Sequence, residues 1–170
     1  MIKLVRPSKE HEKEALEFKK EFFDNDESTI NGSELFDQTD SYDDWLQTVT
    51  NNTSKATVNP DWVVTDTYFA INENKGIVGI IDFRHELKGF LKDFGNSGYS
   101  VRPSERRKGY ASQMLKLILE RAREIKLTSF QLSAEKSNEA SIKTIIKNGG
   151  KYSRSFTVNN EVADIYLIDL

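Results

Sequence analysis

A short basic segment of the chain has the residue types that bind phosphate. Arg106, Arg107 and Lys108 stand directly before Gly109, and the small Ala111 follows. The start of a helix offers unpaired N–H groups and a partial positive charge, and a glycine lets the backbone approach a phosphate without a Cβ in the way. A solvated basic loop is the alternative interpretation. The apolar strand pattern before the segment and the amphipathic helix pattern after it favour a phosphate-binding turn.

The composition argues against several other kinds of site. The 170-residue chain has no cysteine, and His11 and His85 are its only histidines, so we expect no thiol chemistry and no metal site. The net charge of −3 argues against a nucleic-acid binder. No apolar run is long enough to span a bilayer, and the N-terminus soon turns polar and has no apolar signal core, so we expect a cytoplasmic protein that has no membrane contact.

The apolar periodicity predicts the elements that would position this turn. The expected strands are 2–6, 62–71, 77–83, 98–102, 128–133, 151–158 and 161–169, and the expected helices are 8–23, 41–50, 109–125 and 138–148. The segment 85–96 is expected to be irregular. The order β-α-α-β-β-β-α-β-α-β-β predicts one α/β (α+β) domain over residues 1–170, with a mixed sheet that carries helices on both faces.

The motif Arg106-x-x-Gly109-x-Ala111 resembles the R/Q-x-x-G-x-G/A signature of the GCN5-related N-acetyltransferase (GNAT) superfamily. A second segment, Asn138-x-x-Ser141 followed by a helix that ends before Gly149, resembles the family's N-x-x-A/S helix. The order of elements also matches over nearly the whole chain. The runs 84–87, 98–103 and 148–150 resemble a bacterial subgroup with no assigned acceptor. The resemblance implies a GNAT-like, mostly antiparallel sheet.

The resemblance also implies that acetyl-CoA is the co-substrate. In this family the signature turn holds the pyrophosphate, the preceding strand pairs with the pantetheine arm, and a backbone N–H, here near Val101, polarises the thioester carbonyl. Asn138 and Ser141 match positions that reach the pantetheine arm, although Asn138 also suits a helix N-cap. The implied cofactor-binding residues are Tyr99, Ser100, Val101, Arg106, Arg107, Lys108, Gly109, Tyr110, Ala111, Ser112, Asn138 and Ser141.

The sequence departs from the family at the position that supplies the general acid. Many members have a tyrosine seven residues after the asparagine, and it protonates the departing thiolate; this chain has Ile145 there. Tyr99 and Tyr152 are candidate substitutes, with an ordinary sheet aromatic as the alternative for each. A thiol with a pKa near ~8.5 is also a fair leaving group without help.

An amine acceptor arrives mostly as ammonium and needs a base. His85 and Glu86 follow the strand before the signature strand, where family members often place a base, and His85 has a suitable intrinsic pKa. A loop histidine without catalytic duty is the alternative. Asp82 and Glu135 are weaker candidates, and a base acting through water would need no single side chain.

The stretch from Glu21 to Ser54 contains nine acidic residues and no Lys or Arg. In the family this region overhangs the acceptor site, so it could form a negative lip that attracts a cationic amine; a solvated helix surface is the alternative. The substrate-binding candidates are Glu34, Asp37 and Asp40. Trp62 and Phe36 could line the pocket, or they could simply pack in the core.

Two functions therefore remain open at this stage. One is an enzyme that moves an acetyl group from acetyl-CoA to an amine. The other is a non-catalytic acyl-CoA-binding sensor or partner module, which Ile145 favours. The expected state is a monomer or a homodimer.

Overall fold

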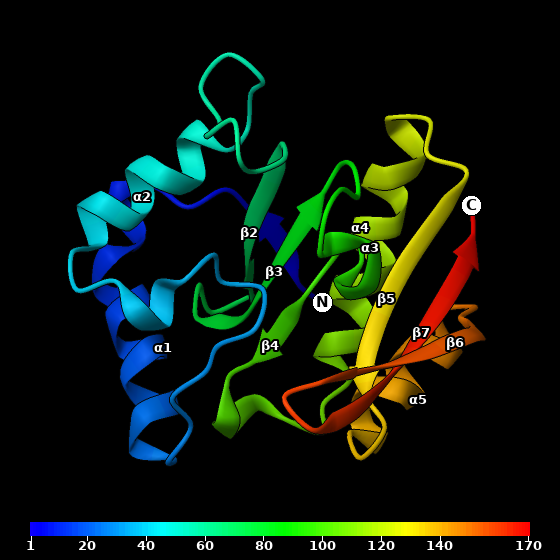
Figure 1. Cartoon of the computed structure of the whole chain (residues 1–170). Coiled ribbons are helices and arrows are strands. Elements are labelled where there is room, and N and C mark those ends of the chain that lie inside the picture. Colours follow the sequence, from blue (N-terminus) through cyan, green and yellow to red (C-terminus); the bar gives the residue numbers. More distant parts are fainter.

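The computed structural model describes all 170 residues, which form two antiparallel sheets with helices packed around them (Figure 1). The first sheet has the strand order β1-β2-β3-β4, and the second has the order β5-β7-β6. The strands are β1 Lys3–Val5, β2 Thr65–Ile71, β3 Ile77–Arg84, β4 Tyr99–Val101, β5 Ser129–Glu135, β6 Lys151–Val158 and β7 Glu161–Asp169. The helices are α1 Glu12–Asp24, α2 Tyr42–Asn51, α3 Leu91–Phe94, α4 Tyr110–Glu124 and α5 Glu139–Lys147.

The two sheets meet between β4 and β5, and these two strands form no ladder with each other. A single isolated bridge between Gly95 and Leu132 joins them just before β4 begins. The Asn96 side chain strengthens this junction, because its Oδ1 accepts a hydrogen bond from the Gln131 N–H at 2.8 Å. Beyond the junction the facing edges of β4 and β5 are left without partners. This confirms the predicted GNAT-like architecture, with antiparallel pairing throughout each sheet.

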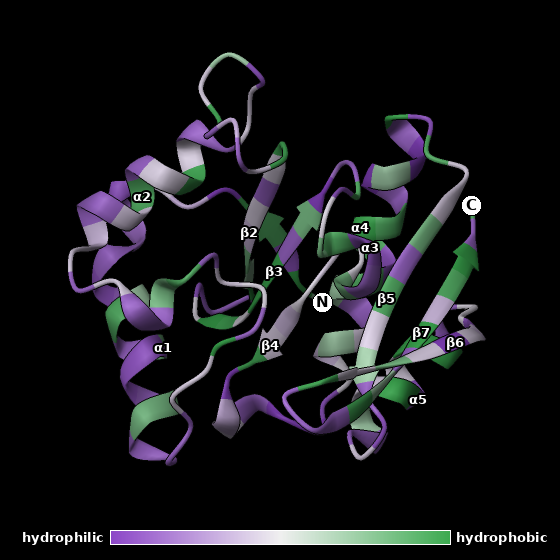
Figure 2. Cartoon of the chain, in the orientation of Figure 1, coloured by the Kyte–Doolittle hydropathy of each residue, from purple (hydrophilic) through white to green (hydrophobic).

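Two apolar clusters cover opposite faces of the first sheet. One joins α1, α2 and the loop between them to β2 and β3, and the other joins α4 and α5 to β3, β5 and β7. Alternation along β3 explains the division, since Ile80 belongs to the first cluster and Ile81 to the second. Figure 2 shows hydrophobic colour along the central strands and hydrophilic colour on the outer turns of α2. None of the helices combines the length and the apolar character that crossing a membrane requires.

The structure differs from the sequence expectation in a few local features. The second strand begins at Thr65 rather than Trp62, and the segment 85–96, expected to be irregular, contains the short helix α3. Leu16, Phe23 and Ile146, which are apolar residues within the expected helices, are 42%, 42% and 54% exposed. Each is adjacent in sequence to a buried residue (Ala15, Phe22 or Ile145), and neighbouring helix residues point about 100° apart, so only one of the two faces the core.

Candidate active site

The turn between β4 and α4 has the backbone form that the sequence predicted. A 3-10 turn, Pro103–Glu105, leads into Arg107 at φ +64° and Gly109 at φ +82°, and α4 begins at Tyr110. None of the backbone N–H groups from Arg107 to Ser112 donates a hydrogen bond within the protein. They are the donors that a helix start leaves free, and the positive end of the α4 dipole lies among them. A Cβ on Gly109 would meet no atom within 4 Å, so the space over the turn is open.

Acidic residues of α1 and of the loop after it form ion pairs with the arginines at the beginning of this turn. The Arg106 guanidinium forms a two-pronged ion pair with Glu27, at 2.8 and 2.9 Å, and lies over the Phe22 ring. Arg102 pairs with two acids of α1, with Glu14 through Nη1 and with Glu21 through Nε. The hydrogen bond from Arg106 lowers the pKa of Glu27 despite partial burial, so the pair stays charged at neutral pH. The Arg106 side chain is therefore occupied by Glu27, whereas the backbone N–H groups of the turn are free.

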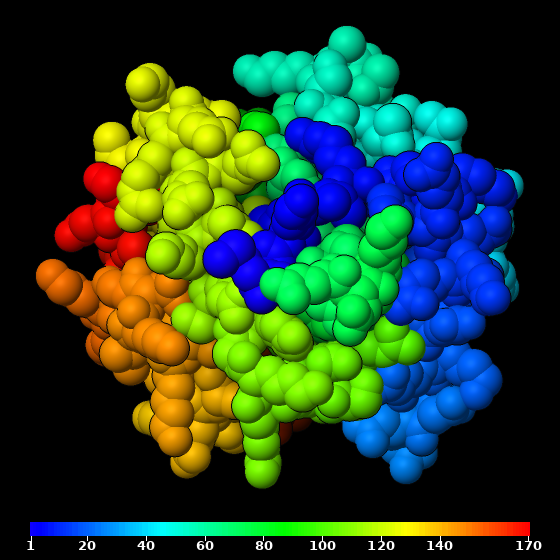
Figure 3. Space-filling view, turned by 180° about the vertical axis from the view of Figure 1, so that it is seen from behind, coloured from blue at the N-terminus to red at the C-terminus, as the bar shows by residue number.

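The remaining basic residues of the turn are exposed. Lys108 pairs with Glu105 at 2.8 Å, and Arg107 has no acidic partner. Ser112, in the first turn of α4, accepts a hydrogen bond from Asn148 at the end of α5, which leaves its O–H free to donate. Figure 3 shows this segment in lime green at the lower edge of the molecule, between α1 and its following loop in blue and α5 in orange. The turn is thus open to a large anionic ligand.

The edge of β4 that faces β5 offers unpaired backbone groups. Arg102 N–H donates to Val78, and Asp82 N–H donates to Gly98, so the even-numbered residues of β4 are bonded to β3. Because bonding alternates in an antiparallel ladder, the N–H and C=O groups of Tyr99 and Val101 point toward the unpaired side. The Val101 carbonyl accepts a hydrogen bond from Arg106 Nε at 3.2 Å, whereas its N–H has no protein partner.

Side chains from β4 and α5 meet at the inner end of this edge. The Tyr99 hydroxyl lies 2.9 Å from the Ser141 hydroxyl, and burial raises the pKa of Tyr99, which keeps it a proton donor at neutral pH. Asn138 caps α5 by accepting the Ser141 N–H at 3.2 Å, as the N-cap interpretation predicted. Ile145 is fully buried one turn further along the same face of α5.

The family model described as the acetyltransferase (GNAT) domain matches residues 4–151. The chain belongs to the GNAT acetyltransferase family. No curated protein gives a significant match to the sequence. Solved GNAT structures nonetheless share the fold over almost the whole chain.

Three of these structures illustrate the range of acetyltransferases that share the fold. The microcin C7 self-immunity acetyltransferase MccE, in complex with acetyl-CoA and AMP, is 17% identical, covers 99% of this chain and 92% of its own, and has a TM-score of 0.73. RimL, the ribosomal L7/L12 alpha-N-protein acetyltransferase, in complex with coenzyme A, is 14% identical with 99% and 94% coverage and a TM-score of 0.72. A chimera of the spermidine N-acetyltransferase SpeG from Vibrio cholerae and hSSAT is 12% identical with 99% and 94% coverage and a TM-score of 0.67. Identities this low establish the fold alone.

In this structure, His85 and Glu86 lie at the end of β3 that is far from the turn between β4 and α4. His85 is six residues beyond Gly79, the partner of Val101, which is about 20 Å along a strand. Its Nε2 lies 2.7 Å from Asp66, which also pairs with Arg6. Burial would raise the pKa of Asp66, but the hydrogen bonds from His85 and Arg6 outweigh it and lower the pKa. The catalytic role of His85 and Glu86 stays a prediction.

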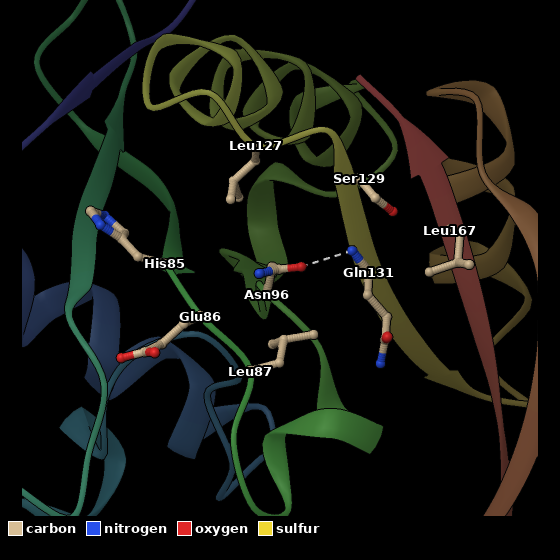
Figure 4. Close-up of a pocket in the computed structure, with 8 residues that line it drawn as sticks. All are labelled: His85, Glu86, Leu87, Asn96, Leu127, Ser129, Gln131 and Leu167. Atoms are coloured by element: carbon tan, nitrogen blue, oxygen red, sulfur yellow. Dashed lines mark hydrogen bonds between the residues drawn. The ribbon is translucent and has the colours of Figure 1, made fainter.

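A pocket of about 250 Å³ lies at this far end (Figure 4). Figure 4 shows His85 and Glu86 on one wall and Leu127, Ser129 and Gln131 on the other, with the Asn96–Gln131 hydrogen bond between them. No residue of β4 or of the turn 106–112 lines this pocket.

The three predicted acceptor-binding acids have different surroundings. Asp37 accepts the Ile30 N–H at 2.7 Å and so shapes its own loop, and Asp40 is exposed. Glu34 alone turns inward, toward Asp82 on β3. The other acids between Glu21 and Ser54 are either paired with basic side chains or exposed. The paired ones are Glu21, Asp24, Glu27 and Asp43.

Glu34 and Asp82 form a small charged cluster with a residue that the sequence reasoning did not select. Arg84 Nη2 lies 3.2 Å from Asp82, and its Nη1 donates to the Gly95 carbonyl at 2.7 Å. Burial, followed by repulsion from Asp82, raises the pKa of Glu34 to about 9. The i, i+2 spacing of Asp82 and Arg84 was the available signal, since such residues share one face of a strand. The expected strand 77–83 ended one residue too early to use it, whereas β3 continues to Arg84.

The aromatic candidates also have different surroundings. Phe36 is buried in the α1–α2 core, as the packing interpretation predicted. Trp62 is half-buried beside Glu34 and stacks against Phe90 at 5.9 Å between ring centroids. Tyr152 is 60% exposed and its hydroxyl meets Ser155. Tyr99 is therefore better placed than Tyr152 to reach a thioester beside β4.

Proposed function

We propose that residues 1–170 form one domain that transfers an acetyl group from acetyl-CoA to an amine acceptor. The observation that carries this proposal is the run of free N–H groups from Arg107 to Ser112 at the start of α4, next to the unpaired edge of β4. These donors suit the CoA pyrophosphate, and the free edge suits the amide groups of pantetheine.

The chain's own groups account for the stages of such a transfer. The N–H groups of Tyr99 and Val101 lie where they can polarise a thioester carbonyl as it becomes an oxyanion. The Tyr99 hydroxyl, held by Ser141, can give a proton to the departing sulfur in place of the tyrosine that Ile145 replaces. Asn138 and Ser141, at the start of α5, can contact the pantetheine arm while Asn138 also caps the helix. The acceptor would approach from the Glu34 side of β4.

The alternative is an acyl-CoA-binding module without turnover. The buried Ile145 favours it, because no side-chain acid projects from that position of α5. Incubation with acetyl-CoA and a panel of primary amines, with free thiol followed over time, separates the two functions. The enzyme releases thiol in an amine-dependent way. Saturable CoA binding with no amine-dependent thiol release would support the binding module instead.

A further inference from the structure

The loop that carries Glu34 is fixed against the sheet by backbone contacts. Gly32, Glu34 and Leu35 all have positive φ, at +75°, +51° and +64°. A Cβ on Gly32 would overlap the Gly98 carbonyl, and Ser100 Oγ donates to the Asn31 carbonyl at 2.9 Å. Left-handed backbone at non-glycine residues costs about 1–3 kcal/mol each and persists where the surroundings impose it. The loop is thus held so that Glu34 lies over β3 and β4.

The carboxyl group that Glu34 approaches belongs to Asp82, which is buried and hydrogen-bonded within the first sheet. The Asp82 side chain is 1% exposed and accepts the Gly98 N–H at 2.6 Å and Arg84 Nη2 at 3.2 Å. Arg84 is the one cation beside the two carboxyl groups, and no other charged group from β3, β4 or the loop acts on Glu34. Two adjacent carboxylates with a single cation cannot both stay ionised at low cost, so the pair retains a proton.

One buried donor beside the pair lacks a partner. Arg84 Nε is shielded from solvent and forms no hydrogen bond. Buried polar atoms are nearly always paired, so an exception calls for an explanation such as a catalytic role. The Trp62 N–H, by contrast, is directed at the Glu34 carboxyl and favours its ionised form.

We propose that Glu34 and Asp82 share one proton and together accept the proton of the acceptor's ammonium group. This inference rests on the proposed acetyl transfer and names the base that acts in it. Asp82 is three residues along β3 from Gly79, the partner of Val101, which is about 10 Å. His85 is twice as far along the same strand, so the pair is the nearer base to a thioester on β4.

The protons balance over one turnover. Binding of the ammonium cation beside the pair releases its shared proton to solvent, because a positive charge favours the ionised carboxylates. The ionised pair then takes one proton from the ammonium, and the nitrogen lone pair attacks the thioester carbon. The C–S bond breaks with its electron pair on sulfur, and Tyr99 gives a proton to the sulfur. The nitrogen's second proton returns to Tyr99 through water, and the pair again holds one proton.

A row of aromatic rings beside the pair indicates the kind of amine. Trp62 stacks near Phe90 at 5.9 Å, Phe90 near Phe94 at 5.8 Å, and Phe94 near Phe156 at 5.6 Å. Phe90 is 62% exposed, so this wall is available to an apolar group. We therefore infer a primary alkylamine that carries an apolar substituent, and 2-phenylethylamine is the matching probe.

The first test measures the shared proton without turnover. Protein labelled with ¹³C at glutamate carboxyls is titrated in the presence of CoA, and the Glu34 signal is assigned by its loss in Glu34→Gln. We expect Glu34 to titrate near pH 9, and to titrate at least one pH unit lower after addition of 2-phenylethylamine or in Asp82→Asn. Titration of Glu34 below pH 6, or no response to the amine, would overturn the shared proton.

The second test measures catalysis with a matched control. Glu34→Gln should lower kcat/KM for the amine by at least ~100-fold, in line with loss of a general base, and leave CoA affinity unchanged. Glu73→Gln makes the same chemical change at a side chain that is 83% exposed and should have no effect. Unchanged turnover in Glu34→Gln would refute the pair and leave the acetyl transfer standing. Titration near pH 9 without thiol release by any amine would refute the acetyl transfer itself and support only the shared proton.

Discussion

Replacement of Gly109 by leucine should remove CoA binding while the fold remains. The site over Gly109 is open, so a Cβ there meets no protein atom within 4 Å, but the residue must keep φ near +82°. That conformation costs an L-residue about 1–2 kcal/mol. For a chain of this length, about 2–4 °C of melting temperature is lost per kcal/mol, so we expect a decrease of roughly 2–8 °C.

The loss of CoA affinity should be much larger than the loss of stability suggests. The added side chain would occupy the space where the pyrophosphate approaches the N–H groups of the turn. Hydrogen bonds to charged groups contribute about 1.5–3 kcal/mol each, so loss of two raises the Kd of CoA roughly 10²–10⁴-fold. Calorimetric titration with CoA measures this change, and circular dichroism on heating measures the stability.

A matched variant separates phosphate exclusion from backbone strain. Gly89 also has a positive φ, +60°, and open space around it, but it lies in the segment before α3, away from the turn. Gly89→Leu should lose similar stability and keep CoA affinity. S-acetylpantetheine, which lacks the diphosphate, should bind wild type and Gly109→Leu equally well. Equal CoA affinity in Gly109→Leu and wild type would refute the phosphate assignment, and equal losses in both glycine variants would show that strain alone is responsible.

Three further outcomes follow from side-chain contacts. Tyr99→Phe should slow thiol release about 10-fold in single-turnover measurements with CoA affinity unchanged, because the proton donor to sulfur is lost; an unchanged rate would exclude Tyr99 as the acid. Arg106→Gln and Glu27→Gln should each cost about 1 kcal/mol or less of unfolding free energy, and a double-mutant cycle should show coupling between them; additive effects would contradict the ion pair. Native Glu34 keeps its proton to about pH 9, whereas an unfolded glutamate loses it near 4.5, so the folded state binds more protons in this window. Unfolding free energy should then fall as pH rises from 5 to 9, by up to ~1.4 kcal/mol per pH unit, and Glu34→Gln should flatten that slope in urea denaturation; parallel curves for the two proteins would be inconsistent with a raised pKa.

The sequence by itself determined the local features of the proposed CoA site. Gly109 before an amphipathic helix specifies the turn, since only the start of a helix leaves consecutive N–H groups free and only glycine adopts φ +82° without strain. The capping role of Asn138 likewise follows from its place at the start of one helix. These features depend on neighbours close in the chain, which is why periodicity and motif spacing could find them.

The tertiary structure alone decided which side chains meet on the acceptor side. The pattern of acids suggested Glu34, Asp37 and Asp40 equally, but only the packing of Gly32 against Gly98 turns Glu34 toward Asp82. Arg106, whose charge suggested direct phosphate contact, is instead held by Glu27, 79 residues away in sequence. Such pairings depend on how the loop after α1 lies on the sheet, and charge spacing along the chain carries no information about that contact.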